Sequence, residues 1–163
     1  MDKLNPTRHD LPEKARQMAV ALCNASLADA LDLALSLKQA HWNVKGPQFQ
    51  QLHELFDMVY THAVAWADLV AERAVQLGGT AEGALGHVRE RTRLPAYVLG
   101  AADGAAHVTA VAGALAAFAK STRAAIDASA AAGDAGTADL FTEVSRAVDK
   151  DLWLVEAHLT AKS

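Results

Sequence analysis

Four residues in one short stretch carry side chains that bind transition metals. His53 and Asp57 are four residues apart, as are Asp68 and Glu72. In an α-helix, which turns by about 100° per residue, all four fall within an arc of roughly 100° and share one face. Imidazole and carboxylate suit iron, manganese or zinc, and the single Cys23 offers no thiolate cluster for a softer metal. Iron is the first hypothesis.

One chain cannot bring both pairs of residues to the same metal ion. Asp57 and Asp68 are eleven residues apart, which is roughly 16 Å along a helix, whereas metal–oxygen bonds are only about 2 Å long. Two copies packed antiparallel about a two-fold axis would place His53 and Asp57 of one copy opposite Asp68 and Glu72 of the other. A dimer would then carry two identical shared sites.

His41 is expected to join the first half-site, because the Gly46-Pro47 turn folds the preceding helix back onto the one that carries His53. The proposed ligand set is therefore three residues plus two. A di-iron centre within one chain would instead show Glu-x-x-His pairs, and the sequence contains no such pair.

Two other interpretations of the acidic face stay open. A single His/acid pair at four-residue spacing is common on solvated helices and usually means only local pairing, although two pairs on one face make that reading weaker. The face could also bond to arginines of a partner in a helical assembly without metal. Burying these carboxylates with no partner would be costly, so the face must meet water or a positive charge.

The elements that carry these residues are predicted to be helices. The chain has 163 residues, of which 52% are hydrophobic and only 6% aromatic, with long alanine-rich runs. This composition favours closely packed helices, and the length suits one domain. Residues 1–11 lack periodicity and are expected to form a flexible tail before a single domain at 12–163.

Apolar periodicity predicts four long helices separated by glycine-containing turns. The three breaks are Gly46-Pro47, the crossover after Gly78-Gly79, and the turn around Gly133. The crossover leaves room for one short extra helix and makes helices two and three parallel. The expected fold is thus an all-α, ferritin-like four-helix bundle, with helices at 12 to about 43, about 48 to 77, 103 to about 131, and about 137 to 159.

Charge and hydropathy exclude several classes of protein. The formal net charge is −4 and the pI is about 5.9, so no global positive field would draw the molecule to nucleic acid or an anionic membrane. The most apolar early stretch, 18–37, is interrupted by Asn24, Asp29 and Asp32, which predicts an amphipathic helix and no membrane span. The sequence shows no secretory signal, and its lone cysteine fits a reducing cytoplasm.

The residues around the candidate ligands resemble the signature of a known family. The run from His41 to Gly46 (HWNVKG) is followed by Phe49, His53, Asp57, Asp68 and Glu72-Arg73-Ala74, and the match continues at 78–79, 137–139 and 149–153. This pattern resembles the Dps family, the DNA-protection-during-starvation mini-ferritins, over nearly the whole chain.

The resemblance implies a hollow shell of twelve identical subunits with ferroxidase sites at two-fold interfaces. Ferrous iron would be oxidised by hydrogen peroxide, or by oxygen, and stored inside as ferric mineral. By the family's motif, His41, His53 and Asp57 come from one subunit and Asp68 and Glu72 from its partner, and each is present here.

The resemblance also suggests two further sites. Trp42 is similar to the family tryptophan that intercepts stray oxidants, and its alternative role is packing at an interface. Acidic pores at three-fold axes admit iron in the family, and Asp127, Asp134 and Asp139 are candidates because they lie near the turn between helices three and four. Aspartates beside turns are, however, most often caps.

DNA binding is supported less well than iron binding. In the family it usually depends on a lysine-rich tail, whereas here Lys3 and Arg8 are balanced by Asp2 and Asp10, so few phosphates would be neutralised per chain. Twelve copies could still supply avidity. The alternative hypothesis is therefore a mainly structural, nucleoid-associated protein that coats DNA.

Overall fold

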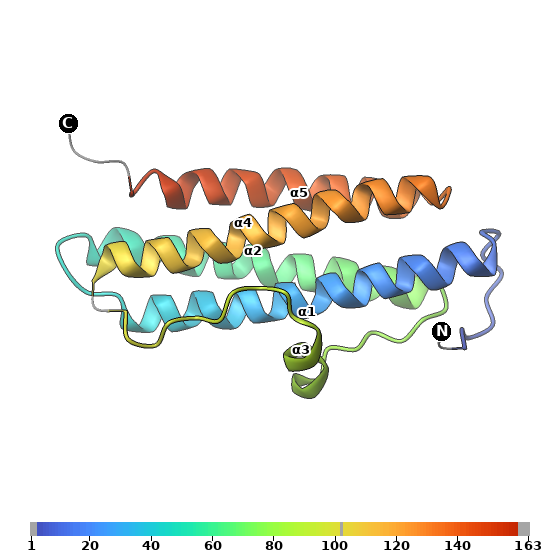
Figure 1. The fold of residues 1–163 in the computed structure, drawn as a ribbon, viewed down its shortest axis with the longest axis horizontal. Coiled ribbons are helices and arrows are strands. Elements are labelled where there is room, and N and C mark those ends of the chain that lie inside the picture. The colour runs from blue at the N-terminus through green and yellow to red at the C-terminus, as the bar shows by residue number, and fades with distance from the viewer. Residues whose placement is uncertain (1–2, 102, 160–163) are drawn as a thin grey trace.

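Helices make up the secondary structure of the chain. The computed structural model describes residues 3–101 and 103–159, which contain five helices and no strand (Figure 1). The predicted all-α bundle with one short helix in its crossover is confirmed. The helices are α1 (Glu13–Asn43), α2 (Phe49–Gln76), α3 (Leu85–Arg91), α4 (Gly104–Ala131) and α5 (Ala135–Glu156).

Two helical hairpins form the bundle. α1 pairs with α2 and α4 pairs with α5, and the two pairs lie side by side (Figure 1). The crossover leaves the end of α2, returns along the bundle and carries α3 against α1. Consequently α2 and α4 run in the same direction, as expected for a ferritin-like bundle.

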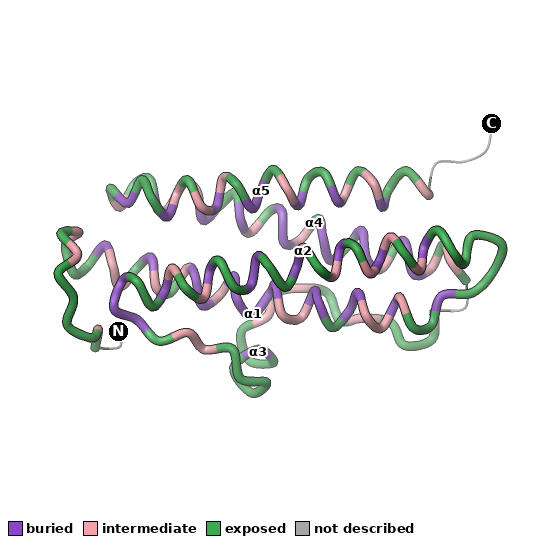
Figure 2. The backbone as a smooth tube through the Cα atoms, turned by 180° about the vertical axis from the view of Figure 1, so that it is seen from behind, coloured by how far each residue is buried: buried purple, intermediate pink, exposed green. Residues whose placement is uncertain are grey.

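The core lies between the four long helices, and Figure 2 shows their buried positions on the sides that face one another. Phe56, Phe118 and Phe141 are fully buried, and each such side chain stabilises the fold by about 1.5–3 kcal/mol. Trp66 of α2 also reaches Phe118 of α4, with ring centroids 5.9 Å apart. Small residues such as Ala30 and Ala63 fill the remaining positions, which lets the helices approach closely.

The turn between α1 and α2 determines how the two helices face each other. Gly46 has a φ of 107°, a left-handed conformation that favours glycine. The Phe49 amide donates to the Gly46 carbonyl at 3.0 Å, and the Val44 amide donates to the Ala40 carbonyl at 2.9 Å. The chain thus reverses within a few residues, and the end of α1 lies beside the start of α2.

Buried polar contacts hold the crossover against α1. Asp29 is fully buried and accepts hydrogen bonds from the Arg93 amide at 2.8 Å and from its guanidinium at 2.6 Å. Asn24 donates to the Thr80 carbonyl at 2.9 Å and accepts from the Glu82 amide at 3.0 Å. These bonds satisfy charged and amide groups on a core helix, so they fix the path of the crossover.

The segment before α1 contacts the opposite end of the same hairpin. The Asn5 amide donates to the Gly78 carbonyl at 2.7 Å, and Arg16 donates to the Leu77 carbonyl at 3.1 Å. Gly79 packs so tightly on Val20 that a Cβ there would lie 2.5 Å from its side chain. Tail, α1 and the end of α2 therefore share one junction, while the mobility expected for residues 1–11 stays a prediction.

α1 is long and apolar enough, by length and composition alone, to cross a membrane. More than half of its most apolar stretch is nevertheless buried against the other helices. It also carries the buried carboxylate of Asp29, paired with Arg93. These contacts are those of the core helix of a bundle.

The last helix begins slightly earlier than the sequence suggested. It was expected from about Thr137, whereas α5 starts at Ala135. The reason is the N-cap residue Asp134, whose carboxylate accepts a hydrogen bond from the Thr137 amide at 2.9 Å. Gly136 therefore belongs to the first turn of the helix and not to the loop.

Candidate metal centre

His41 and His53 meet across the α1–α2 hairpin. Their rings stack with centroids 3.7 Å apart and an interplanar angle of 20°. Nδ1 of His41 donates to the backbone carbonyl of His53 at 2.8 Å, and Nδ1 of His53 donates to that of His41 at 2.9 Å. Because a carbonyl oxygen only accepts, each Nδ1 carries the proton, so each Nε2 keeps its lone pair for a metal ion.

A cleft of about 420 Å³ opens beside the two rings. Asp57, one helical turn beyond His53, also lines this cleft. The hairpin has thus assembled the three residues predicted for the first half-site around one opening. The lining comprises His41, Gln50, His53, Glu54, Asp57, Met58 and Thr61.

Lys38 is the residue at this site that sequence reasoning missed. Its ammonium forms an ion pair with the Asp57 carboxylate and lies 4.8 Å from the centre of the Tyr60 ring. A hydrogen bond from Lys38 holds the pKa of Asp57 below its usual value, despite some desolvation, and the positive charge of Lys38 acts in the same direction. Lys38 precedes His41 by three residues, a spacing that could have revealed their shared face.

Asp68 and Glu72 lie further along α2 and are exposed. Asp68 borders an apolar groove of about 450 Å³ with Leu27, Leu31 and Val64, while Glu72 borders the adjoining groove with Val75. Neither residue lines the cleft of the first half-site. In the part of the chain that the structure describes, no three His, Cys, Asp or Glu side chains are grouped to hold a metal ion.

Comparisons with known proteins place the chain in a family. Residues 20–162 match the model of the ferritin-like domain. The DNA protection during starvation protein of Agrobacterium fabrum is 47% identical over 161 residues, which span 99% of each chain. The chain belongs to the Dps family.

Solved structures agree with this assignment. DpsC from Streptomyces coelicolor has a TM-score of 0.94 and 30% identity, covering 99% of this chain and 94% of its own. Dps from Microbacterium arborescens, solved in a high iron form, has a TM-score of 0.85 and 32% identity, covering 96% of this chain and 99% of its own. The Dps resemblance seen in the sequence is thereby confirmed.

The three aspartates considered for a Dps-type pore differ in their surroundings. Asp127 and Asp139 are exposed near the α4–α5 turn. Asp134 is only 1% exposed and bonds to Thr137 and to Arg73, the latter at 2.9 Å. Burial opposes its ionisation, but these bonds outweigh burial and hold its pKa below the usual value. The carboxylate of Asp134 is thus buried as the N-cap of α5 and bonded to Arg73. Asp127 and Asp139 remain the predicted pore residues.

Trp42 follows the ligand candidate His41 and is 68% exposed. An indole this open to solvent in one chain is free either to meet a partner subunit or to react with a diffusing oxidant. Its predicted role as an interceptor of oxidants stays a prediction.

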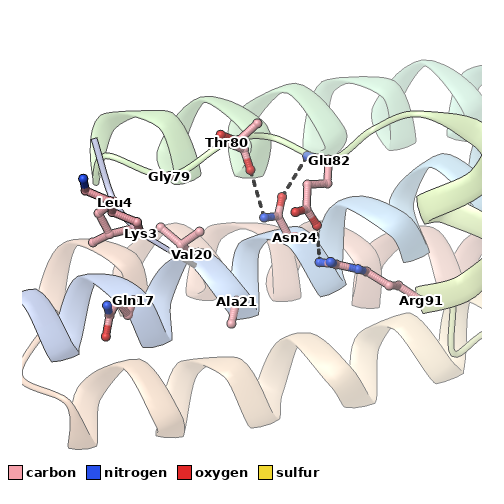
Figure 3. Close-up of a pocket in the computed structure, with 10 residues that line it drawn as sticks. All are labelled: Lys3, Leu4, Gln17, Val20, Ala21, Asn24, Gly79, Thr80, Glu82 and Arg91. Atoms are coloured by element: carbon pink, nitrogen blue, oxygen red, sulfur yellow. Dashed lines mark hydrogen bonds and ion pairs between the residues drawn. The ribbon is translucent and has the colours of Figure 1, made fainter. Parts of the chain in front are cut away.

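A second cleft, of about 450 Å³, lies at the tail junction (Figure 3). Its polar groups are largely committed to one another, because Asn24 bonds to the crossover backbone and Glu82 pairs with Arg91. It contains no histidine and none of the residues of the Dps-type ligand set. The cleft at His41 and His53 is therefore the better candidate for metal chemistry.

Proposed function

We propose that this Dps-family protein is a ferroxidase and iron store whose active sites are shared between two subunits. His41, His53 and Asp57 of one subunit would bind ferrous iron together with Asp68 and Glu72 of the other. The observation that carries the proposal is the reciprocal hydrogen bonding of the two histidines, which leaves each Nε2 with its lone pair in a cleft that Asp57 also lines. This is the arrangement expected of metal ligands whose orientation is set by backbone carbonyls.

An exposed apolar surface between the two half-sites supports pairing about a two-fold axis. The midpoint between Asp57 and Asp68 falls near Val64, which is 43% exposed. Leu35 and Leu85 are exposed around the same groove of about 250 Å³. Apolar surface of this kind is commonly covered by a partner. A second copy, related to the first by a two-fold axis that passes near Val64, would complete two sites at once.

The proposed chemistry follows from the ligand types. Neutral imidazoles hold the incoming ferrous ion, whereas carboxylates stabilise the ferric product more strongly and so favour its oxidation. Hydrogen peroxide accepts two electrons, so one molecule oxidises two ferrous ions. Lys38 must release Asp57 when iron binds, and the neighbouring Tyr60 ring can hold its ammonium by a cation–π contact.

The finer features proposed for the assembly come from the family. They are a shell of twelve subunits, storage of ferric mineral inside it, and protection of DNA by removal of iron and peroxide in the cytoplasm. Direct coating of DNA is the lesser candidate, because Lys3 and Arg8 of the tail are balanced by Asp2 and Asp10 in the sequence and Asn5 is bonded to the protein body.

The decisive experiment tests whether the site is shared. Ferrous iron is added anaerobically to the purified assembly, hydrogen peroxide is titrated in, and ferric absorbance is followed. His53→Ala/Asp57→Ala and Asp68→Ala/Glu72→Ala should each lose rapid oxidation, while the control His158→Ala/Glu143→Ala keeps it. If the two inactive variants are co-assembled, each mixed dimer regains one complete site, so about one quarter of the wild-type activity should return for random pairing.

The alternatives predict different results. A site within one chain would leave the co-assembled mixture inactive. Equal oxidation rates in the wild type and in both ligand variants would refute the metal assignment and favour DNA binding or plain assembly. In that case, retardation of DNA that survives loss of the ligands and weakens with salt would identify a DNA-coating protein.

A further inference from the structure

Tyr97 and His107 form a hydrogen-bonded pair outside the ligand set. Tyr97 lies in the crossover before α4, and its hydroxyl oxygen is 2.5 Å from Nδ1 of His107 on α4. His107 is only 2% exposed, and burial raises the pKa of Tyr97 to about 12. The phenol is therefore protonated and has a single nitrogen base within hydrogen-bond distance.

The surroundings of His107 determine which group donates. Burial lowers the pKa of His107, and the smaller opposing effects of the Asn43 carbonyl and of Asp103 do not restore it, so the ring is neutral at neutral pH. Nε2 is buried and has no hydrogen-bond partner among the described residues, whereas Nδ1 faces the Tyr97 hydroxyl. The protonated phenol has an O–H to donate at this contact, and we therefore assign the proton of the neutral ring to Nε2. Nδ1 then accepts the proton of Tyr97.

The pair packs against the end of the hairpin that carries the two ligand histidines. Asn43 is the last residue of α1, adjacent to Trp42 and two residues beyond His41. Gly104, the first residue of α4, lies against the side chain of Leu52, which precedes His53. The pair and the start of α4 thus pack against residues that lie two positions from His41 and one position from His53 in the sequence.

A phenol loses an electron readily only if its proton can leave at the same time, because the oxidised phenol is a very strong acid. A neutral imidazole already bonded to the hydroxyl supplies that acceptor, and burial of His107 keeps this base from solvent. Tyr97 has this partner. The other tyrosine, Tyr60, instead lies beside the ammonium of Lys38, which cannot accept a proton.

We propose that Tyr97 and His107 act as a proton-coupled redox pair that supplies one electron when peroxide is reduced at a site holding a single ferrous ion. The inference rests on the proposed ferroxidase function. Such a site gives peroxide only one electron, which breaks the O–O bond to leave hydroxide and a hydroxyl radical. An electron from Tyr97 converts the radical to a second hydroxide, and the phenolic proton moves to Nδ1 of His107.

The cycle closes with a second ferrous ion. It returns one electron to the tyrosyl radical, and His107 returns the proton. The sum is two ferrous ions oxidised by one peroxide to two ferric ions and two hydroxides, so the pair is unchanged and no radical leaves the protein. The role is most important at low iron occupancy, when the second electron is not available from a neighbouring ion.

The test uses the fact that the chain has only two tyrosines. The assembled protein is loaded anaerobically with less than one ferrous ion per site, mixed with hydrogen peroxide and freeze-quenched for electron paramagnetic resonance. A tyrosyl radical is expected in the wild type and in the matched control Tyr60→Phe, and it should be lost in Tyr97→Phe. His107→Gln, which keeps Tyr97 but removes the imidazole base, should lose it as well.

A second readout separates this role from packing. A spin trap should capture more hydroxyl radical from Tyr97→Phe than from the wild type, while oxidation of a fully iron-loaded sample stays unchanged. Iron oxidation without any tyrosyl radical in the wild type, or a radical that persists in Tyr97→Phe, would overturn the redox pair and leave the ferroxidase proposal standing. No iron oxidation in the wild type would overturn the proposed function and the pair with it.

Discussion

Lys38 forms an ion pair with Asp57, so a metal ion bound there as proposed would have to compete with its ammonium. The ammonium lowers the pKa of this carboxylate, chiefly through a direct hydrogen bond. Asp57 is about half exposed, so solvent screens its attraction to Lys38. The ion pair therefore adds little to the stability of the fold, and its main expected effect is on metal binding. The same lysine would repel a second cation bound nearby, which makes it a residue that tunes affinity.

Replacing Lys38 by methionine is expected to tighten metal binding. Lys38→Met removes both a competitor for Asp57 and a neighbouring positive charge, so the affinity for a redox-inert ion such as Co²⁺ should rise by roughly tenfold at pH 7, equivalent to about 1.4 kcal/mol. Anaerobic calorimetric titration measures the change. Lys45→Met, which removes an exposed lysine of the turn, is the control. Unchanged or weaker binding in Lys38→Met would contradict a competitive role.

The pH dependence of that variant has a definite sign. The pKa of Asp57 lies below its usual value in the wild type, so removing Lys38 should bring it back towards the usual value of about 3.9. Asp57 is ionised at pH 7 in both proteins, so the gain in affinity is complete there. On acidification towards pH of about 4 the variant protonates first, and its advantage should disappear.

At the scale of elements, helix ends decide where functional residues come to lie. Glycine and proline breaks were enough to predict four long helices and the crossover, because such residues interrupt helical periodicity in the sequence itself. They also predicted that His41 would meet His53. The ion pair between Lys38 and Asp57 was missed because its partners lie on different helices. The burial of Asp134 was missed because spacing along the chain does not show which carboxylate faces an arginine.

The start of helix α5 depends on the carboxylate of Asp134, its N-cap residue. Asp134→Ala removes the N-cap of α5 and leaves the largely buried Arg73 without its partner. At pH 7 we expect a loss of about 3 kcal/mol of stability, seen as a lower thermal midpoint of the assembled protein. The exposed Asp139→Ala on the same helix should change stability by less than about 0.5 kcal/mol.

The effect of Asp134 should also depend on pH. Its folded pKa is depressed, so its contribution is complete above the usual aspartate pKa of about 3.9 and is lost as pH falls through the lower folded value. The difference between wild type and Asp134→Ala should therefore shrink only below pH of about 4. A difference already absent at pH 6 would mean that the carboxylate is not ionised in the folded protein.

At the scale of the whole molecule, the proposed two-fold dimer accounts at once for the two half-sites and for the apolar surface between them. The chain alone leaves Asp68 and Glu72 beside grooves lined by leucine, valine and alanine. It also leaves Leu85 on α3 strongly exposed near the same surface. One two-fold contact would cover this surface and complete both sites, so assembly and catalysis should be lost by the same substitution.

Val64→Lys tests this coupling, because a residue near a two-fold axis lies close to its own symmetry mate. The substitution would place two ammonium groups against each other within an apolar contact, which costs far more than one exposed charge. We expect the helices to remain intact by circular dichroism, whereas native mass spectrometry shows loss of the assembly and peroxide-dependent iron oxidation falls with it. Val98→Lys, at an exposed valine of the crossover, should keep both. An assembled and fully active Val64→Lys protein would place the subunit contact, and therefore the shared site, on another face of the bundle.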